Sequence, residues 1–146
     1  EGGVASFSTE RRVETVEQGW RMFRDHPFFG VGLGNFRPVS RQVYQDLFFR
    51  PPHNSYMWSL SEGGMFCLLL YLLLFALTWR DIRWLQASPA VPPDLRWITA
   101  ALEPSFLLLL LYSAFSDSWL SPITYILIML VIVFKRYVSR RRVVVV

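Results

Sequence analysis

The sequence predicts an all-α integral membrane protein with about three transmembrane helices and an extracytoplasmic helical segment. Hydrophobic residues make up 53% of the 146-residue chain, and they gather in three long segments rich in Leu, Ile, Val and Phe. A small soluble core could not bury so many consecutive apolar side chains, whereas a bilayer can. Residues 1–58 are instead polar and rich in arginine. The contrast predicts a polar segment outside the membrane, followed by membrane helices.

The predicted spans are residues 59–79, 97–115 and 119–134. Each is close to the roughly 20 residues that a helix needs to cross the hydrocarbon. Tryptophans at the ends of the spans are typical of an aromatic belt at the membrane interface; they are Trp58, Trp79, Trp97 and Trp119.

The distribution of positive charge predicts how these spans are oriented. The 80–96 loop and the 135–146 tail are basic, whereas the 116–118 connection contains no cation. Basic loops stay on the cytoplasmic side of a membrane. We therefore expect the 80–96 loop and the basic tail to be cytoplasmic and residues 1–58 to be extracytoplasmic.

The polar segment begins with a predicted amphipathic helix. Ser8 or Thr9 can cap this helix, and apolar residues then recur at helical spacing. Glu17 and Arg21 have the spacing of an i,i+4 ion pair. Pro27 disfavours helical geometry in the residue before it, so the helix is predicted to end at 25–26.

Alternating glycines follow at positions 30, 32 and 34. Their spacing differs from the dinucleotide-binding fingerprint, and no strand precedes them. Such a run is typical of an extended or turning segment whose backbone approaches another element closely. Asn35 can then begin a short helix that continues to about Phe48.

A histidine precedes the first span. Pro51-Pro52 stiffens the chain before His53, and Asn54 or Ser55 can cap the helix that follows. Histidine titrates near neutral pH, so an imidazole at the membrane surface can accept a proton from a hydroxyl. The Gly63-Gly64 pair is small enough for another helix to pack closely against it.

The order of these motifs resembles the C-terminal half of the O-antigen ligase and O-antigen polymerase superfamily of bacterial membrane glycosyltransferases. The resemblance extends through the hydrophobic spans and covers most of the chain. It rests on Arg12, His26-Pro27, the 30–36 run, His53-Asn54-Ser55-Tyr56 and Glu62-Gly63-Gly64.

Members of this superfamily are multi-span helical proteins of the bacterial inner (cytoplasmic) membrane. They transfer a glycan from a polyprenyl diphosphate carrier to a hydroxyl of another glycan, a lipid A core or a protein. The resemblance implies inverting transfer without a metal or another cofactor. It also implies that Arg12 holds the diphosphate and that His53 activates the acceptor hydroxyl. Further candidates for contacts with diphosphate or glycan are Arg11, Arg37, Arg41, Arg50 and Asn54.

Other functions remain as alternatives. A transporter or channel-like subunit would carry ionisable residues inside its spans, and Glu103 is the span residue considered for that role. The chain begins without Met, as expected for the C-terminal piece of a longer protein, and such a fragment alone could be catalytically inert. Motifs for binding nucleic acid are absent, and the acidic residues lack the spacing of metal ligands. The sequence does not distinguish ligase activity from polymerase activity.

Overall fold

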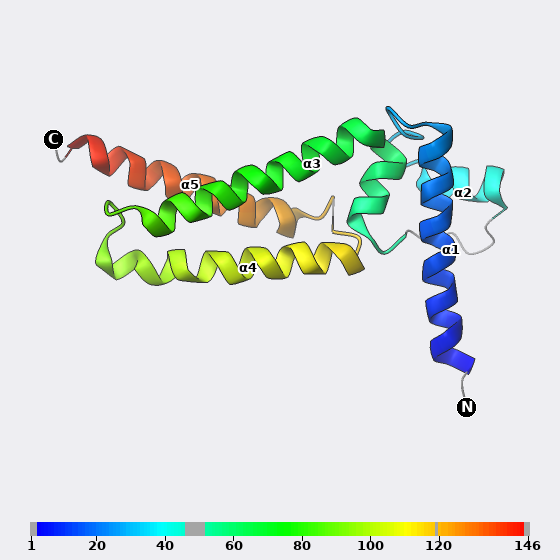
Figure 1. The fold of residues 1–146 in the computed structure, drawn as a ribbon, viewed down its shortest axis with the longest axis horizontal. Helices are drawn as coiled ribbons and strands as arrows, with labels where there is room; N and C mark the ends of the chain where they lie inside the picture. Colours follow the sequence, from blue (N-terminus) through cyan, green and yellow to red (C-terminus); the bar gives the residue numbers. More distant parts are fainter. Residues whose placement is uncertain (1–2, 46–51, 119, 145–146) are drawn as a thin grey trace. The chain divides into compact units, whose positions relative to one another are not determined.

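A computed structural model of the chain describes residues 3–45, 52–118 and 120–144, with the backbone alone described for 3–11 and 142–144. Regular structure in these residues is helical throughout (Figure 1), which confirms the predicted all-α class. In chain order the elements are α1 (Gly3–Asp25), α2 (Phe36–Tyr44), α3 (Ser55–Ala87), the 3-10 turn η1 (Pro93–Leu95), α4 (Arg96–Phe115) and α5 (Pro122–Val144).

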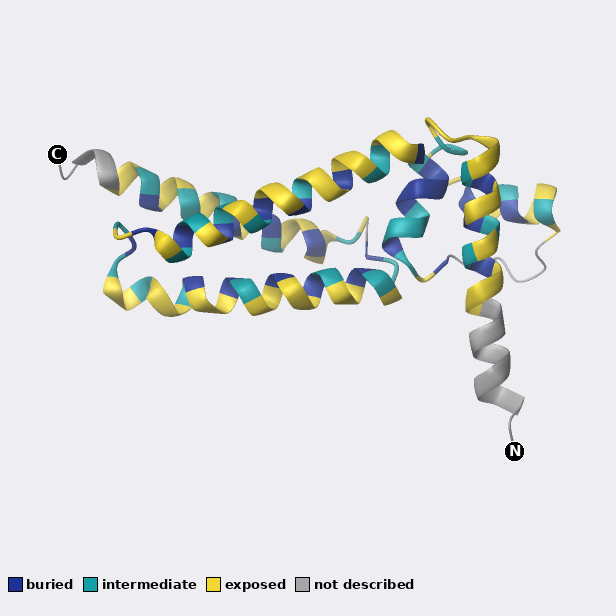
Figure 2. Ribbon diagram, in the orientation of Figure 1, coloured by how far each residue is buried: buried dark blue, intermediate teal, exposed yellow. Residues whose placement is uncertain are grey.

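Three helical segments in the described part of the chain are long and apolar enough to cross a membrane. They are Ser55–Ala87, Pro93–Phe115 and Pro122–Arg141. Many of their residues are exposed (yellow in Figure 2), and large apolar residues are frequent among these, as expected for surfaces that contact hydrocarbon. The number of predicted spans is therefore confirmed. Trp119 lies outside the described residues, and the orientation across the membrane remains a prediction.

The chain divides into two compact units. Unit 1 comprises residues 1–71 and 113–119, and unit 2 comprises residues 72–112 and 120–146. Helices α3 and α4 contribute to both units. The residues predicted to be functional lie in unit 1.

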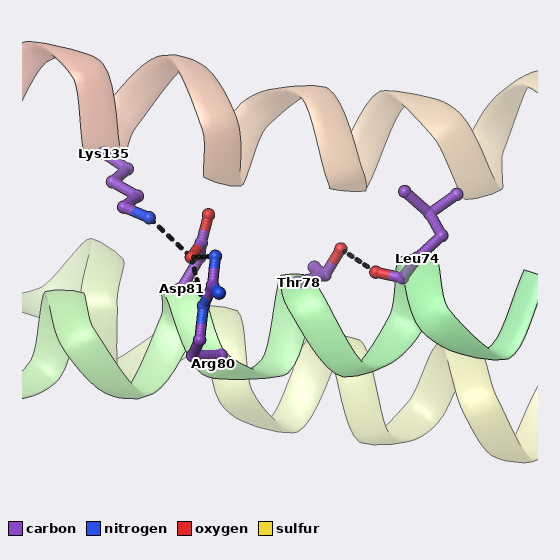
Figure 3. Close-up of polar contacts among 5 residues, drawn as sticks. All are labelled: Leu74, Thr78, Arg80, Asp81 and Lys135. Carbon is purple, nitrogen blue, oxygen red and sulfur yellow. Dashed lines mark hydrogen bonds and ion pairs between the residues drawn. The ribbon is translucent and has the colours of Figure 1, made fainter. Parts of the chain in front are cut away.

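In unit 2, α3 packs against both α4 and α5. The rings of Phe75 and Phe106 meet edge to face, with centroids 5.8 Å apart, and join α3 to α4. Lys135 of α5 donates to Asp81 of α3 over 2.6 Å (Figure 3). In the same view, Thr78 donates its hydroxyl to the Leu74 carbonyl within α3. Polar groups on these apolar helices are thus paired within the protein.

The carboxylate of Glu103 is also paired. One oxygen accepts from Arg83 at 3.3 Å, and the other accepts from Gln86 at 2.7 Å. These partners lie on α3, so the bonds hold α4 to α3. Glu103, the span residue considered for transport, is therefore engaged in contacts between helices.

The N-terminal helix is longer than the sequence predicts. Because α1 begins at Gly3, Ser8 and Thr9 lie inside the helix and do not cap it. Its end at Asp25 agrees with the prediction. The next helix, α2, follows Asn35 and ends at Tyr44.

Helix α3 is broken at Gly64, where φ is 68° and ψ is −167°. An intact helix would pair the Ser61 carbonyl with the Met65 amide and the Glu62 carbonyl with the next amide along. Here those carbonyls accept from Val31 and Gly32, each at 2.9 Å. The Met65 amide donates instead to the carbonyl of residue 27 at 2.8 Å. The glycine-rich segment thus replaces the backbone partners that the break removes.

Two glycines allow this exchange of partners. A Cβ at Gly30 would overlap the Glu62 carbonyl group, and a Cβ at Gly64 would overlap the Phe28 carbonyl group. The predicted close approach of the glycine run to another element is therefore confirmed. The expectation for Gly63-Gly64 was wrong in one respect, because Gly64 meets a loop and not another helix.

We expect Gly30→Ala and Gly64→Ala to destabilise unit 1 more than Gly34→Ala does. All three glycines have positive φ, so each alanine costs roughly 1–2 kcal/mol in backbone strain. Only Gly34 has no atom within 4 Å of the added Cβ. Thermal unfolding of the detergent-solubilised protein would measure the difference. Equal losses in all three variants would contradict the proposed overlap.

Candidate functional site

A buried carboxylate connects the broken helix to α2. Glu62 is only 1% exposed, and its two oxygens accept from the amides of Gly34 and Phe36, each at 3.0 Å. The first amides of a helix lack partners within it and carry partial positive charge. Asn35, at the N-cap of α2, makes no capping bond with its side chain. Glu62 therefore supplies an acceptor for the first amide of α2 and another for the amide of Gly34, just before the N-cap.

Side chains of α1 hold α2 at two points. Ser40 donates to Gln18 over 2.6 Å, and the Tyr44 hydroxyl donates to Asp25 over 2.5 Å. Burial, with the bond to Asp25 as a further cause, raises the pKa of Tyr44 to about 12. This pKa is raised in the folded state. The Tyr44–Asp25 hydrogen bond therefore contributes fully to the free energy of unfolding below about pH 10, and this contribution declines as pH rises towards 12. At neutral pH the hydroxyl remains a donor.

His53 lies just before α3 and is held in an unusual backbone conformation. Its φ is 45°, a region that residues other than glycine rarely occupy. Its Nδ1 is 3.1 Å from Oδ2 of Asp117, and the two side chains are 44% and 31% exposed. A hydrogen on Nδ1 would point to this carboxylate, leaving Nε2 of a neutral imidazole as the acceptor. The histidine is thus oriented by a charged partner and still reaches solvent.

A network of serines fixes the position of Asp117. The Ser55 hydroxyl donates to the Ser116 carbonyl at 2.7 Å and accepts from the Ser118 amide at 2.8 Å. The hydroxyls of Ser113 and Ser118 lie 3.0 Å apart. These bonds tie the first residue of α3 to the connection between α4 and α5. Asp117 is consequently held next to His53.

Asn54 caps α3. Its Oδ1 accepts from the Met57 amide at 2.9 Å. Of the two capping residues that the sequence allows, Asn54 and Ser55, the cap is therefore Asn54. The side chain proposed to contact substrate is therefore also engaged in holding the helix.

The predicted arginines lie on other elements. Arg12 is exposed on α1, and Arg37 and Arg41 are exposed on α2. Arg50 and the side chain of Arg11 lie outside the part that the structure describes. Within that part, no hydrogen bond or ion pair joins Arg12 or Arg37 to His53. Their convergence on a shared substrate remains a prediction.

Sequence reasoning missed two residues of this region. Glu62 was recognised only as part of a motif, and it bonds to amides 26 and 28 positions away. Asp117 was recognised only as a loop residue. Each pairing spans two elements, so no local spacing indicates it. Among the described residues, no group of three His, Cys, Asp or Glu could hold a metal ion.

Residues 2–72 match the family model described as O-antigen ligase. This stretch is therefore similar to the O-antigen ligase family. No curated protein and no solved structure matches the chain. The match contains the arginine, the glycine run, His53 and the Glu62-Gly63-Gly64 motif, and it confirms the family predicted from their order. It ends at Leu72, so the resemblance over the later spans remains a prediction.

The O-antigen ligase match corresponds closely to unit 1. The family motifs pair with one another there, since the glycine run supplies backbone partners to the residues around Glu62. Together with the three apolar helices, the match indicates a bacterial multi-span membrane protein of the ligase or polymerase type of glycosyltransferase.

We expect Glu62→Gln to destabilise unit 1 by about 1–3 kcal/mol. Each oxygen of the Glu62 carboxylate accepts one backbone N–H, whereas the side-chain amide of glutamine has only one oxygen, so one of the two hydrogen bonds is lost. Glu14→Gln is the matched control, since Glu14 is exposed on α1 and should change stability by less than roughly 0.5 kcal/mol. Thermal unfolding in detergent would compare them. Identical unfolding curves for the two variants would show that the carboxylate is not required at this position.

Proposed function

We propose that the chain belongs to a glycosyltransferase that moves a glycan from a polyprenyl diphosphate carrier to an acceptor hydroxyl. The observation that carries this proposal is the pairing of His53 with Asp117 in the unit that matches the O-antigen ligase family. An imidazole oriented by a carboxylate is suited to accept a proton from a hydroxyl. Its exposure leaves room for a large acceptor.

The proposed reaction exchanges one bond at the anomeric carbon for another. The acceptor oxygen attacks this carbon while its proton passes to Nε2 of His53. The bond between the carbon and the diphosphate oxygen breaks, and the electron pair stays with the diphosphate. Attack from the face opposite the leaving group inverts the configuration at the anomeric carbon.

Arg12 is the proposed partner of the leaving diphosphate. Its side chain is exposed on α1 and forms no ion pair with the described residues. A guanidinium can donate two parallel hydrogen bonds to phosphate oxygens and neutralise the charge that develops there. We propose Arg11, Arg37, Arg41 and Arg50 as further contacts for the diphosphate or the glycan, and Asn54 as a contact for the acceptor. Membrane lipid surrounds the carrier in this scheme.

We expect His53→Ala and Arg12→Ala to abolish glycan transfer in a complementation assay that uses the full-length protein in a strain lacking its own enzyme. Removal of a general base alone slows a reaction by about 10²–10⁴-fold. Arg140→Ala is the control, because Arg140 is an exposed arginine of unit 2. Protein levels in the membrane must match. Normal transfer by both variants at normal levels would refute the proposed roles.

The same assay distinguishes the two activities of the family. A polymerase would yield a ladder of glycan lengths, whereas a ligase would join a preformed glycan to its acceptor in a single step. We propose the transfer chemistry for either activity, since the proton and the leaving group are handled in the same way in both.

We expect Asp117→Asn to lower kcat with little change in KM, because in the proposed mechanism Asp117 orients the imidazole and makes no contact with the substrate. Asparagine can offer its amide nitrogen to Nδ1 and so favour the wrong tautomer. Asp117→Glu should recover part of the rate, since it restores the carboxylate. Steady-state kinetics of the purified enzyme would measure both. A change confined to KM would show that Asp117 acts on substrate binding.

A further inference from the structure

A groove runs between α1 and the first turns of α3 in unit 1. Its volume is about 510 Å³, within the range of about 300–1,000 Å³ that is common for small-molecule sites. The residues that line it are Val16, Glu17, Trp20, Arg21, Arg24 and Met57. None of them was predicted to bind substrate.

Helix α1 packs closely against Met57, which lines this groove from the first turn of α3. Gly19 is buried, and a Cβ at this position would lie 2.8 Å from Cγ of Met57. Met57 is also the residue whose amide is capped by Asn54, next to His53 in the chain. The groove therefore reaches the turn of α3 that follows the proposed general base.

Two cations at the groove lack a charged partner. Arg21 and Arg24 are exposed, and neither forms an ion pair within the described part of the chain. The i,i+4 pair between Glu17 and Arg21 that the sequence predicts is not formed. Both guanidinium groups are consequently available to an anion from outside the protein.

The remaining lining groups suit a sugar. Trp20 is 48% exposed, and its ring lies against Phe23 with centroids 5.3 Å apart. An indole presents a broad apolar face with a polar edge. The Glu17 carboxylate can accept from hydroxyl groups but would repel a simple anion. An apolar face, two guanidinium groups and a carboxylate together match a ligand that carries both hydroxyls and an acid group.

We propose that this groove binds an acidic sugar residue of the acceptor glycan. The acid group pairs with Arg21 and Arg24, the ring of the sugar lies on Trp20, and a hydroxyl donates to Glu17. The acceptor is assigned to this groove because it adjoins the turn that follows His53. The inference rests on the proposed function, and it names the chemical class of the acceptor.

The test measures binding without transfer. The probes are a tetrasaccharide of alternating glucuronate and N-acetylglucosamine and the same tetrasaccharide with its carboxylates reduced to alcohols. Full-length protein in neutral detergent is titrated with each probe and followed by saturation-transfer NMR. We expect the double variant Arg21→Gln/Arg24→Gln to weaken binding of the acidic probe at least tenfold and to leave the reduced probe unchanged.

Two further variants complete the comparison. Trp20→Ala should weaken binding of both probes, whereas Arg140→Gln, which alters an arginine of unit 2, should affect neither. Equal affinity for the acidic and the reduced probe in the unaltered protein would overturn the proposal. Loss of acidic-probe binding on transfer to phosphatidylglycerol nanodiscs would also overturn it, because the groove would then serve the anionic lipid surface.

This test is separate from the test of the reaction. His53→Ala should abolish transfer and still bind the acidic probe. If binding fails while His53 proves essential, only the acidic-sugar site is refuted. If His53→Ala still transfers glycan while binding holds, the proposed role of His53 as general base fails and the site remains a sugar-binding groove.

Discussion

The arrangement of unit 1 depends on how the backbone is satisfied at Gly64. A break in a helix leaves carbonyls and amides without partners, and a buried backbone group without a partner costs as much as a lost hydrogen bond. The segment after α1 supplies those partners from residues 27–32. Glu62 adds a second connection, because its carboxylate caps α2. The glycine-rich segment and the residues around Glu62, far apart in the sequence, thus form one structural element. This element places α1 and α2 relative to the start of α3.

This constraint explains the residue types of the family motifs. Only glycine fits at positions 30 and 64, since a Cβ at either would overlap backbone of the other segment. The carboxylate at 62 provides a separate oxygen for each of two amides, whereas an amide or hydroxyl side chain has a single oxygen. On this account, part of the family motif maintains the scaffold. The chemistry that we propose belongs instead to His53, which meets Asp117 just before α3.

Features that follow from local pattern could be predicted from the sequence, whereas features that join distant segments could not. Three helices long and apolar enough to cross a membrane, the end of α1 before Pro27 and a short helix after Asn35 were predicted, and the described residues show them. The break at Gly64 was not, because the surrounding residues have the composition of a continuous helix. The partner of His53 was likewise unpredictable. Asp117 belongs to the connection between α4 and α5, and the bond between Ser55 and Ser116 holds this connection next to His53. Helix α1 starts earlier than the capping pattern indicated.

Gly64 lies inside a helix that is long enough to cross a bilayer. Hydrocarbon offers no hydrogen bonds, so non-helical backbone is tolerated at that depth only when protein encloses it. Here the carbonyls of Ser61 and Glu62 are already satisfied by amides of the glycine-rich segment. The bend can therefore lie below the lipid headgroups without water molecules to satisfy its backbone.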